Sequence, residues 1–272
     1  MKFERTNTKI SLLEDFYSHF NEDDRLKTRH GNVEFITNIK YILDYIHKDD
    51  KIIDVGAGTG AYSIYLHEQG YDIEAIDVVK HNVDVMRTKC PNLKVHMGNA
   101  VKMDNYSDNS FDIAILFGPI YHLLKEEDKI KALKETKRIV KNNGLIFISY
   151  YMNDYAVISY GFIKNNIMES IAEGRIDENY HIISKEDDLF SMVNLEDINH
   201  FNEVMGFERI KIIASDGASD YLRTALNKLS DEAYEEFIKY HLKNCERMDL
   251  LGASSHLLDI VRVKKVWYET TF

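Results

Sequence analysis

The chain of 272 residues contains only 2 cysteines and 2 prolines. Cys90 and Cys245 are too few for a disulfide framework, and neither lies in a metal-ligand spacing, so we expect two structural thiols and no metal site. Pro91 and Pro119 both lie in the first half of the chain, and no Pro-rich or Gly-rich stretch marks a linker. The sequence therefore predicts one large domain, or a core domain with insertions.

Long hydrophobic runs and an excess of basic residues are also missing. No apolar run approaches the roughly 18 residues of a membrane-spanning helix, and residues 1–5 lack the apolar segment of a signal peptide. We therefore expect a cytoplasmic protein without a membrane partner. The formal net charge of -11 argues against a broad phosphate-binding face, so no nucleic-acid partner is expected.

Hydrophobic residues make up 44% of the chain, which is enough for a sizeable core. Short apolar runs rich in β-branched residues are typical of strands buried on both faces, and helical patterns separate them. This alternation implies right-handed crossovers and a parallel sheet. The expected strands are residues 52–55, 73–76, 93–96, 113–117 and 145–150, and the expected helices are 61–69, 82–89 and 125–141, the last ended by the sequence Asn142-Asn143-Gly144.

The segments on either side of this core have other patterns. Residues 1–48 are mostly helical, with an interruption at 25–31, and can cover an edge of the sheet. Apolar residues follow one side of the first helix: Leu12, Leu13, Phe16, Tyr17 and Phe20. A second helix is expected at 33–46, and the later elements are a helical segment at 152–175, a loop or irregular hairpin at 176–191, a helix at 195–205 ended by Gly206, a strand at 207–214, a helical stretch from 220 to about 250 and a strand at 257–264.

The most informative feature is the stretch 52–60, which reads IIDVGAGTG. An apolar run ends in three alternate glycines and continues as a helix. Glycines at such a turn let the backbone approach a ligand closely, because side chains there would collide with it. A second apolar run ends at Asp77, whose carboxylate can accept hydrogen bonds from both hydroxyls of a ribose. The pattern therefore predicts a nucleotide-type site.

Two kinds of nucleotide site fit an acid about 20 residues after a glycine turn. One is the dinucleotide site of an NAD(P)-dependent oxidoreductase, whose fingerprint is Gly-x-Gly-x-x-Gly. Here the third glycine follows after a single residue, and Asp54 stands two positions before the first glycine. These differences argue against a dinucleotide site.

The stretch 52–60 resembles motif I of the class I S-adenosylmethionine-dependent methyltransferases. Gly98-Asn99-Ala100 is similar to the Gly-Asp-Ala that often follows the third strand in that family, and residues 111–123 and 141–145 resemble the fourth-strand motif and the turn into the fifth strand. The resemblance covers roughly residues 48–150. It implies a doubly wound, Rossmann-like α/β fold with a seven-stranded, mostly parallel sheet.

The resemblance also implies a division of the chain. Residues 49–151 would form the core domain that binds S-adenosylmethionine, and residues 191–272 would complete it. The N-terminal segment 1–48, the insertion 152–190 and a second insertion at about 218–250 would form a cover that selects the acceptor. The acceptor would be a small molecule, and S-adenosylhomocysteine would be the product.

The resemblance assigns donor contacts residue by residue. Asp54 would organise the ammonium end of the donor, Asp77 its ribose, and Asn99 its adenine amino group. The amide oxygen of Asn99 can accept that hydrogen bond in place of the commoner acid. The full predicted donor set is Asp54, Gly56, Ala57, Gly58, Gly60, Asp77, Val78, Asn99, Ala100 and Phe117.

Methyl transfer requires little side-chain chemistry, because the positive sulfur already activates the methyl group. The protein mainly holds the nucleophile in line at about 3 Å. A hydroxyl, amine or thiol acceptor must lose a proton, usually to a histidine, whereas a thiolate or carbanion needs no base. His122 is the candidate base, with Tyr121 beside it, although a purely structural role for His122 stays open. Tyr17 and His30 are candidate substrate contacts.

A non-catalytic S-adenosylmethionine-binding module is a third possibility, because a fold alone does not establish catalysis. Residues 118–121, Gly-Pro-Ile-Tyr, superficially resemble the Asp/Asn-Pro-Pro-Tyr loop of adenine-amino methyltransferases. Gly118 has no side chain to accept from the target amine, so a DNA target is not expected. The sequence leaves the acceptor and the oligomeric state open.

Overall fold

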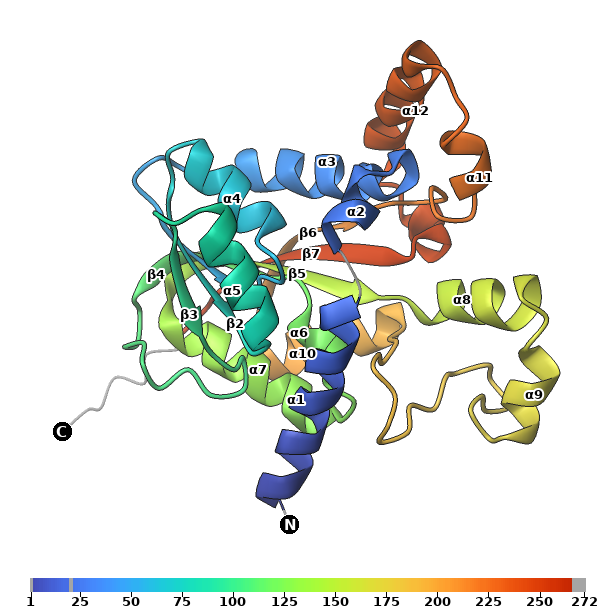
Figure 1. Cartoon of the computed structure of the whole chain (residues 1–272), viewed down its shortest axis with the longest axis horizontal. Coiled ribbons are helices and arrows are strands. Elements are labelled where there is room, and N and C mark those ends of the chain that lie inside the picture. The colour runs from blue at the N-terminus through green and yellow to red at the C-terminus, as the bar shows by residue number, and fades with distance from the viewer. Residues whose placement is uncertain (1, 20–21, 266–272) are drawn as a thin grey trace.

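The computed structural model describes residues 2–19 and 22–265. Its centre is one seven-stranded sheet with the strand order β3-β2-β1-β4-β5-β7-β6 (Figure 1). β7 is antiparallel to both of its neighbours, and the other pairs are parallel, which confirms the predicted fold class. The strands are β1 (Lys51–Val55), β2 (Asp72–Asp77), β3 (Lys94–Met97), β4 (Phe111–Leu116), β5 (Val140–Tyr151), β6 (Glu208–Ala214) and β7 (His256–Arg262).

Helices cover both faces of the sheet. In Figure 1, α3 and α4 lie above the sheet and α7 and α10 lie below it. The strands between them are buried on both faces, as their continuous apolar runs predict: Ile52, Ile53 and Phe147 are 0% exposed. The helices are α1 (Lys2–His19), α2 (Glu22–Lys27), α3 (Arg29–Leu43), α4 (Ala61–Glu68), α5 (Lys80–Lys89), α6 (Pro119–His122), α7 (Glu126–Ile139), α8 (Asn153–Ala156), the π-helix η1 (Val157–Ile163), α9 (Ile167–Ala172), α10 (Leu195–Met205), α11 (Arg223–Leu226), α12 (Asp231–Asn244) and the 3₁₀-helix η2 (Met248–Ala253).

The prediction that the sequence Asn142-Asn143-Gly144 ends a helix is wrong. The helix α7 already ends at Ile139, and the sequence lies within β5. Asn143 adopts a φ of 65°, and a Cβ at Gly144 would lie 2.5 Å from the carbonyl oxygen of Asp112. The left-handed residue and the close backbone approach form a kink at the start of β5, where its register with β4 shifts.

Two predicted boundaries in the cover also differ from the structure. The helical stretch from 220 to about 250 is divided into α11, α12 and η2, because the Ser230 side chain accepts from the Ala233 N–H and starts a new helix. The interruption at 25–31 is much shorter than predicted, since α2 continues to Lys27 and Thr28 caps α3. Phe20, predicted on the first helix, lies outside the described residues.

Strand direction decides which residues meet at the functional edge. β1, β2, β4, β5 and β6 all end at one edge of the sheet, and the antiparallel β7 begins there. α1, η1 and the segment around α11 contribute side chains to the same edge. Among the described residues, no helix is long and apolar enough to cross a membrane.

A buried ion pair holds β7 in its central position. Asp259 of β7 is 0% exposed, and its two oxygens accept from Arg209 Nε at 2.8 Å and Arg209 Nη2 at 2.9 Å. Asn202 of α10 donates to the same carboxylate at 2.7 Å. The strand, its neighbour β6 and the helix α10 are therefore tied together at one carboxylate.

Asp259→Ala should lower the free energy of unfolding by about 3–5 kcal/mol, because it leaves the Arg209 guanidinium half-buried without its counter-charge. Urea denaturation measures this change. The matched control is Glu236→Ala, which removes an exposed carboxylate paired with Lys239 on α12 and should leave the denaturation midpoint unchanged. Equal midpoints for the two variants would contradict the assignment.

Candidate active site

A cavity of about 1680 Å³ opens at the edge where the parallel strands end. Its walls come from the turn after β1, the ends of β2 and β4, α1 and the two insertions. A pocket for one drug-sized ligand has roughly 300–1,000 Å³. The cavity therefore has room for two ligands side by side.

The three positions after β1 require glycine for different physical reasons. Gly56, Gly58 and Gly60 adopt φ values of 74°, 57° and 91°, which favour glycine. A Cβ at Gly58 would meet no heavy atom of the described residues within 4 Å, so this position is open toward the cavity. A Cβ at Gly56 would lie 2.5 Å from Pro119 Cγ, so that glycine also admits the turn before α6.

Gly60, a member of the predicted donor set, lies against α5. It is not among the described residues that line the cavity, and a Cβ there would lie 2.7 Å from Met86 Cγ of α5. The third glycine therefore lets the Met86 side chain of α5 approach the turn before α4, whereas Gly58 provides the open cradle.

Asp77 is held rigidly at the end of β2. Its Oδ2 accepts from the Gly58 N–H at 2.8 Å, and its Oδ1 accepts from the Val79 N–H at 2.8 Å and from Asn82 Nδ2 at 3.3 Å. Burial raises the pKa of Asp77 to about 6, and these hydrogen bonds oppose the rise. The turn after β1 and the end of β2 are thus joined through one carboxylate that lines the cavity.

Asp54 lies beneath the glycine turn and is 1% exposed. Its carboxylate accepts from the Ser63 hydroxyl of α4. Burial raises the pKa of Asp54 to about 7; the Ser63 hydrogen bond opposes the rise and the charge of Asp77 adds to it. A cation bound beside this group would favour its ionised form.

The remaining predicted donor residues also reach the cavity. Asn99 Oδ1 accepts from the Val101 N–H at 3.1 Å, which fixes the turn after β3. The ring of Phe117, after β4, meets Tyr62 edge-on with 4.9 Å between ring centroids. Ala57, Val78, Asn99, Ala100 and Phe117 all line the cavity.

Comparison with known proteins identifies this arrangement. Residues 53–148 match the family model described as a methyltransferase domain. A crystal structure of an S-adenosylmethionine-dependent methyltransferase from Methanosarcina mazei has the same fold, with a TM-score of 0.57 and 14% identity over 83% of this chain and 98% of that one. Residues 53–148 therefore resemble a methyltransferase domain in sequence, and the chain has the fold of the class I S-adenosylmethionine-dependent methyltransferases.

Curated relatives match this chain over part of their length. An uncharacterised methyltransferase of Mycobacterium tuberculosis is 30% identical over 104 residues, which are 38% of this chain and 41% of that protein. A glycine/sarcosine N-methyltransferase of Parasynechococcus marenigrum is 28% identical over 143 residues, or 51% of this chain and 50% of that protein. The chain therefore matches about half the length of these relatives or less.

His122, the predicted base, lies in α6 and lines the cavity, but both of its ring nitrogens have partners. Nδ1 lies 3.0 Å from the Leu189 carbonyl oxygen, so it carries the proton, and Nε2 lies 2.8 Å from the Tyr17 hydroxyl, which donates to it. Burial lowers the pKa of His122 to about 4. In this geometry His122 is a neutral link between α1 and the segment before Phe190, and it would have to release Tyr17 to act as a base.

The other predicted acceptor residues all line the cavity. Tyr121 lies between the rings of His122 and His256, with centroid distances of 5.0 and 6.0 Å. His30 of α3 lies against the second insertion, where its Nδ1 is 3.1 Å from Asn227 Nδ2 and its Nε2 is 3.8 Å from an Asp220 oxygen. The structure thus brings Tyr17, Tyr121 and His122 together and places His30 at a more distant wall.

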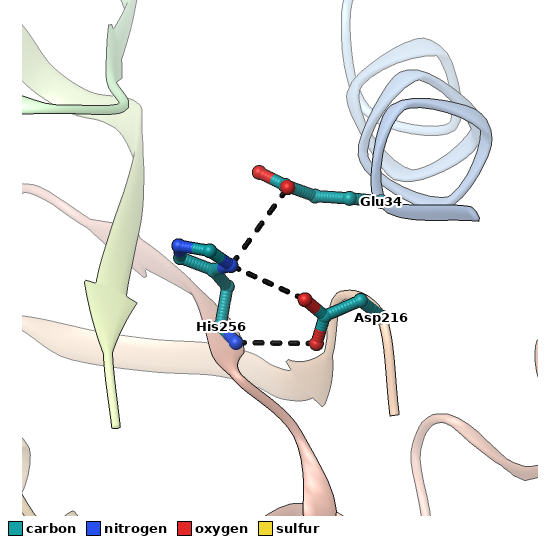
Figure 2. A group of neighbouring side chains, drawn as sticks. All are labelled: Glu34, Asp216 and His256. Atoms are coloured by element: carbon teal, nitrogen blue, oxygen red, sulfur yellow. Dashed lines mark hydrogen bonds and ion pairs between the residues drawn. The ribbon is translucent and has the colours of Figure 1, made fainter. Parts of the chain in front are cut away.

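Sequence reasoning missed a cluster at the same cavity. The cluster consists of Glu34 from α3, Asp216 just after β6 and His256 at the start of β7 (Figure 2). One side-chain nitrogen or oxygen atom of each residue lies within 4.8 Å of those of the other two. No motif joins three residues so far apart in the chain. The sequence indicated the cluster only through the positions of two residues: Asp216 follows a predicted strand and His256 precedes another. Both positions lie at the edge of the sheet where the glycine turn and Asp77 also lie.

The hydrogen bond between Tyr17 and His122 allows a test of how α1 is held on the core. α1 is attached to the core by the Tyr17 hydroxyl and by Glu14, whose Oε2 accepts from the His81 N–H of α5 at 3.4 Å. Tyr17→Phe removes one of these attachments, so amide hydrogen exchange of residues 9–19 should become several-fold faster, while that of α4 is unchanged. Unchanged exchange in α1 would show that the hydroxyl does not hold the helix.

Proposed function

We propose that this protein is an S-adenosylmethionine-dependent methyltransferase that acts on a small molecule. The observation that carries the proposal is the position of Asp77. Its carboxylate is fixed by the Gly58 and Val79 N–H groups, beside a glycine turn with open space above Gly58. A carboxylate and an open backbone cradle at the ends of adjacent parallel strands suit a ribose and the chain attached to it.

The proposed donor contacts follow from the same geometry. Asp77 accepts from the ribose hydroxyls, and Asp54 balances the positive end of the donor. Val78, Asn99 and Ala100 lie against the adenine, with Asn99 Oδ1 as the acceptor at its amino group. Ala57, Gly58 and Phe117 border the methionine part, while Gly60 supports the turn from behind.

When bound, S-adenosylmethionine supplies a methyl group already activated by positive sulfur. The residues of the chain then have to bind, orient and exclude water. α1 and the insertion with η1 close the cavity from outside, and its volume leaves room for an acceptor beside the donor. This second space favours an enzyme over a binding module, which needs only the donor site.

The acceptor is proposed to be small, and glycine and sarcosine are the first compounds to test. The Parasynechococcus relative, which is 28% identical over 143 residues, is a glycine/sarcosine N-methyltransferase. Formation of S-adenosylhomocysteine in the presence of each compound, measured by mass spectrometry, would reveal turnover.

Calorimetry with S-adenosylmethionine, S-adenosylhomocysteine and NADH tests the donor assignment. We expect the first two to bind and NADH not to bind. Asp77→Ala should weaken donor binding by roughly 1–3 kcal/mol, the cost of losing hydrogen bonds to a charged group. Asp84→Ala, on the exposed side of α5, is the matched control and should leave the affinity unchanged. Tight binding of NADH alone would refute the proposal.

Donor binding should also depend on pH. Because the pKa of Asp54 is about 7 and that of Asp77 about 6, both carboxylates become protonated on mild acidification. A cationic donor favours the ionised forms, so its affinity is expected to fall by about tenfold from about pH 8 to about pH 5.5. Calorimetric titration over this range measures the change. Asp54→Asn should flatten the profile, and a flat profile in the wild-type protein would contradict the assignment of both carboxylates.

A further inference from the structure

A buried network of charges occupies the wall of the cavity formed by β6, β7 and α3. Figure 2 shows His256 between Glu34 and Asp216, with the same ring nitrogen facing both carboxylates. Nδ1 of His256 lies 3.2 Å from Asp216 Oδ2 and 3.7 Å from Glu34 Oε2. Arg25 of α2 donates to that Glu34 oxygen at 2.8 Å.

Asp216 is the fixed element of this network. It is 4% exposed, and it accepts from the Ser254 and Ser255 hydroxyls, from the Ser255 N–H at 2.9 Å and from the His256 N–H at 3.1 Å. Burial by itself would raise the pKa of Asp216, but the side-chain hydrogen bond and the charge of His256, together with the Ser254 and Ser255 hydroxyls, lower it to about 2. Asp216 is therefore ionised and can only accept hydrogen bonds.

The ionised carboxylate decides the tautomer of His256. Since Asp216 can only accept, Nδ1 of His256 carries the proton and donates to it. In the neutral ring the lone pair is then on Nε2, which Figure 2 shows directed away from both carboxylates. His256 lines the cavity, so Nε2 is the nitrogen available to a ligand. The same logic orients the histidine of a serine-hydrolase triad.

Tyr121 connects this histidine with the donor site. A Cβ at Gly118 would lie 3.2 Å from the Gly56 carbonyl oxygen and 3.7 Å from the Tyr121 hydroxyl, so Tyr121 reaches the donor turn. The ring of Tyr121 is 6.0 Å from that of His256, measured between centroids, and Tyr151 stacks on His256 at 5.1 Å. His256 thus lies one aromatic ring away from the glycine turn.

We propose that His256, oriented by Asp216 and Glu34, takes the proton from the acceptor during methyl transfer. The inference rests on the proposed function and specifies its acceptor as a molecule whose reacting atom carries a proton, an amine or a hydroxyl. His122 cannot serve in this geometry, because its Nε2 lone pair already accepts from Tyr17.

A lone pair of the acceptor nitrogen or oxygen forms the bond to the methyl carbon, and the electron pair of the broken carbon–sulfur bond stays on sulfur. The acceptor's proton moves to Nε2 of His256, and the imidazolium later returns it to solvent. Glu34 and Asp216 stabilise that imidazolium, while Arg25 balances the charge of Glu34.

The same three residues have the donor atoms of a metal site, but their bonding favours the proton-accepting role. Nδ1 of His256 is a hydrogen-bond donor here, whereas a metal ligand needs its lone pair. Arg25 supplies positive charge at Glu34, and Asp216 accepts from four other protein groups. A divalent ion would have to displace a proton and compete with a guanidinium.

Imidazole nitrogen chemical shifts of the full chain, labelled with ¹⁵N-histidine and bound to S-adenosylhomocysteine, test the proposal without an acceptor. His256→Gln assigns the signal. We expect a proton on Nδ1, a lone pair on Nε2 at high pH, and a pKa above the ordinary value, because Glu34 and Asp216 outweigh the opposing effects of burial and of Arg25. Tyr121 and Tyr151 also face the ring. Asp216→Asn, or Glu34→Gln if the first variant does not fold, should lower this pKa.

Binding and turnover separate this inference from the proposed function. His256→Gln should leave the affinity for S-adenosylhomocysteine within about twofold and lower kcat for sarcosine or glycine by about 10²–10⁴-fold, the usual size of a general-base contribution. The acid limb of the kcat–pH profile, which reports the titration of His256 in the wild-type enzyme, should move to lower pH in Glu34→Gln. His200→Gln, on the outer face of α10, is the control and should retain full activity.

Four results would overturn the role of His256. They are a proton on Nε2 with Nδ1 bare, a pKa insensitive to both carboxylate variants, full turnover in His256→Gln, or micromolar Zn²⁺ binding that His256→Gln abolishes. If neither glycine nor sarcosine is methylated, the nitrogen shifts and the Zn²⁺ titration decide the question. Failure of the wild-type protein to bind S-adenosylhomocysteine would instead refute the proposed function.

Discussion

The reversal of β7 is the constraint on which the site depends. Parallel strands deliver only their carboxyl ends to the functional edge, which here supply the glycine turn, Asp77 and Asn99. β7 runs in the opposite direction between β5 and β6, so its amino end reaches the same edge and brings His256 beside Asp216. Asp259 lies three residues after His256 in β7, and its ion pair with Arg209 of β6 ties the two strands together.

Two buried carboxylates at this edge, Asp54 and Asp216, have different pKa values because their hydrogen-bond partners differ. Asp54 has the Ser63 hydroxyl as a partner, and burial raises its pKa to about 7. Asp216 has several N–H and O–H donors together with a histidine, and its pKa is about 2. The first can change its charge when a cation binds, whereas the second keeps a fixed charge that orients an imidazole. One cavity thus holds one carboxylate whose charge can change and another whose charge is constant.

The cover links the two ends of the cavity. Tyr17 of α1 donates to His122, Glu14 of the same helix meets the start of α5 just after Asp77, and Tyr121 lies between His122 and His256. α1 therefore contacts both the start of α5, close to Asp77, and the part of the cavity wall that carries His122.

The sequence by itself determined the alternating core, the strand positions, the glycine turn and Asp77, because these depend on local patterns of apolar residues and glycine. Nine of the ten residues predicted to contact the donor line the cavity, all except Gly60. Only the tertiary structure decided that Gly60 packs against Met86, that His122 is occupied by Tyr17, and that Glu34, Asp216 and His256 meet. These facts depend on the approach of α5 to the turn before α4, the docking of α1 and the direction of β7. Such contacts join residues far apart in the chain, so no local sequence pattern indicates them.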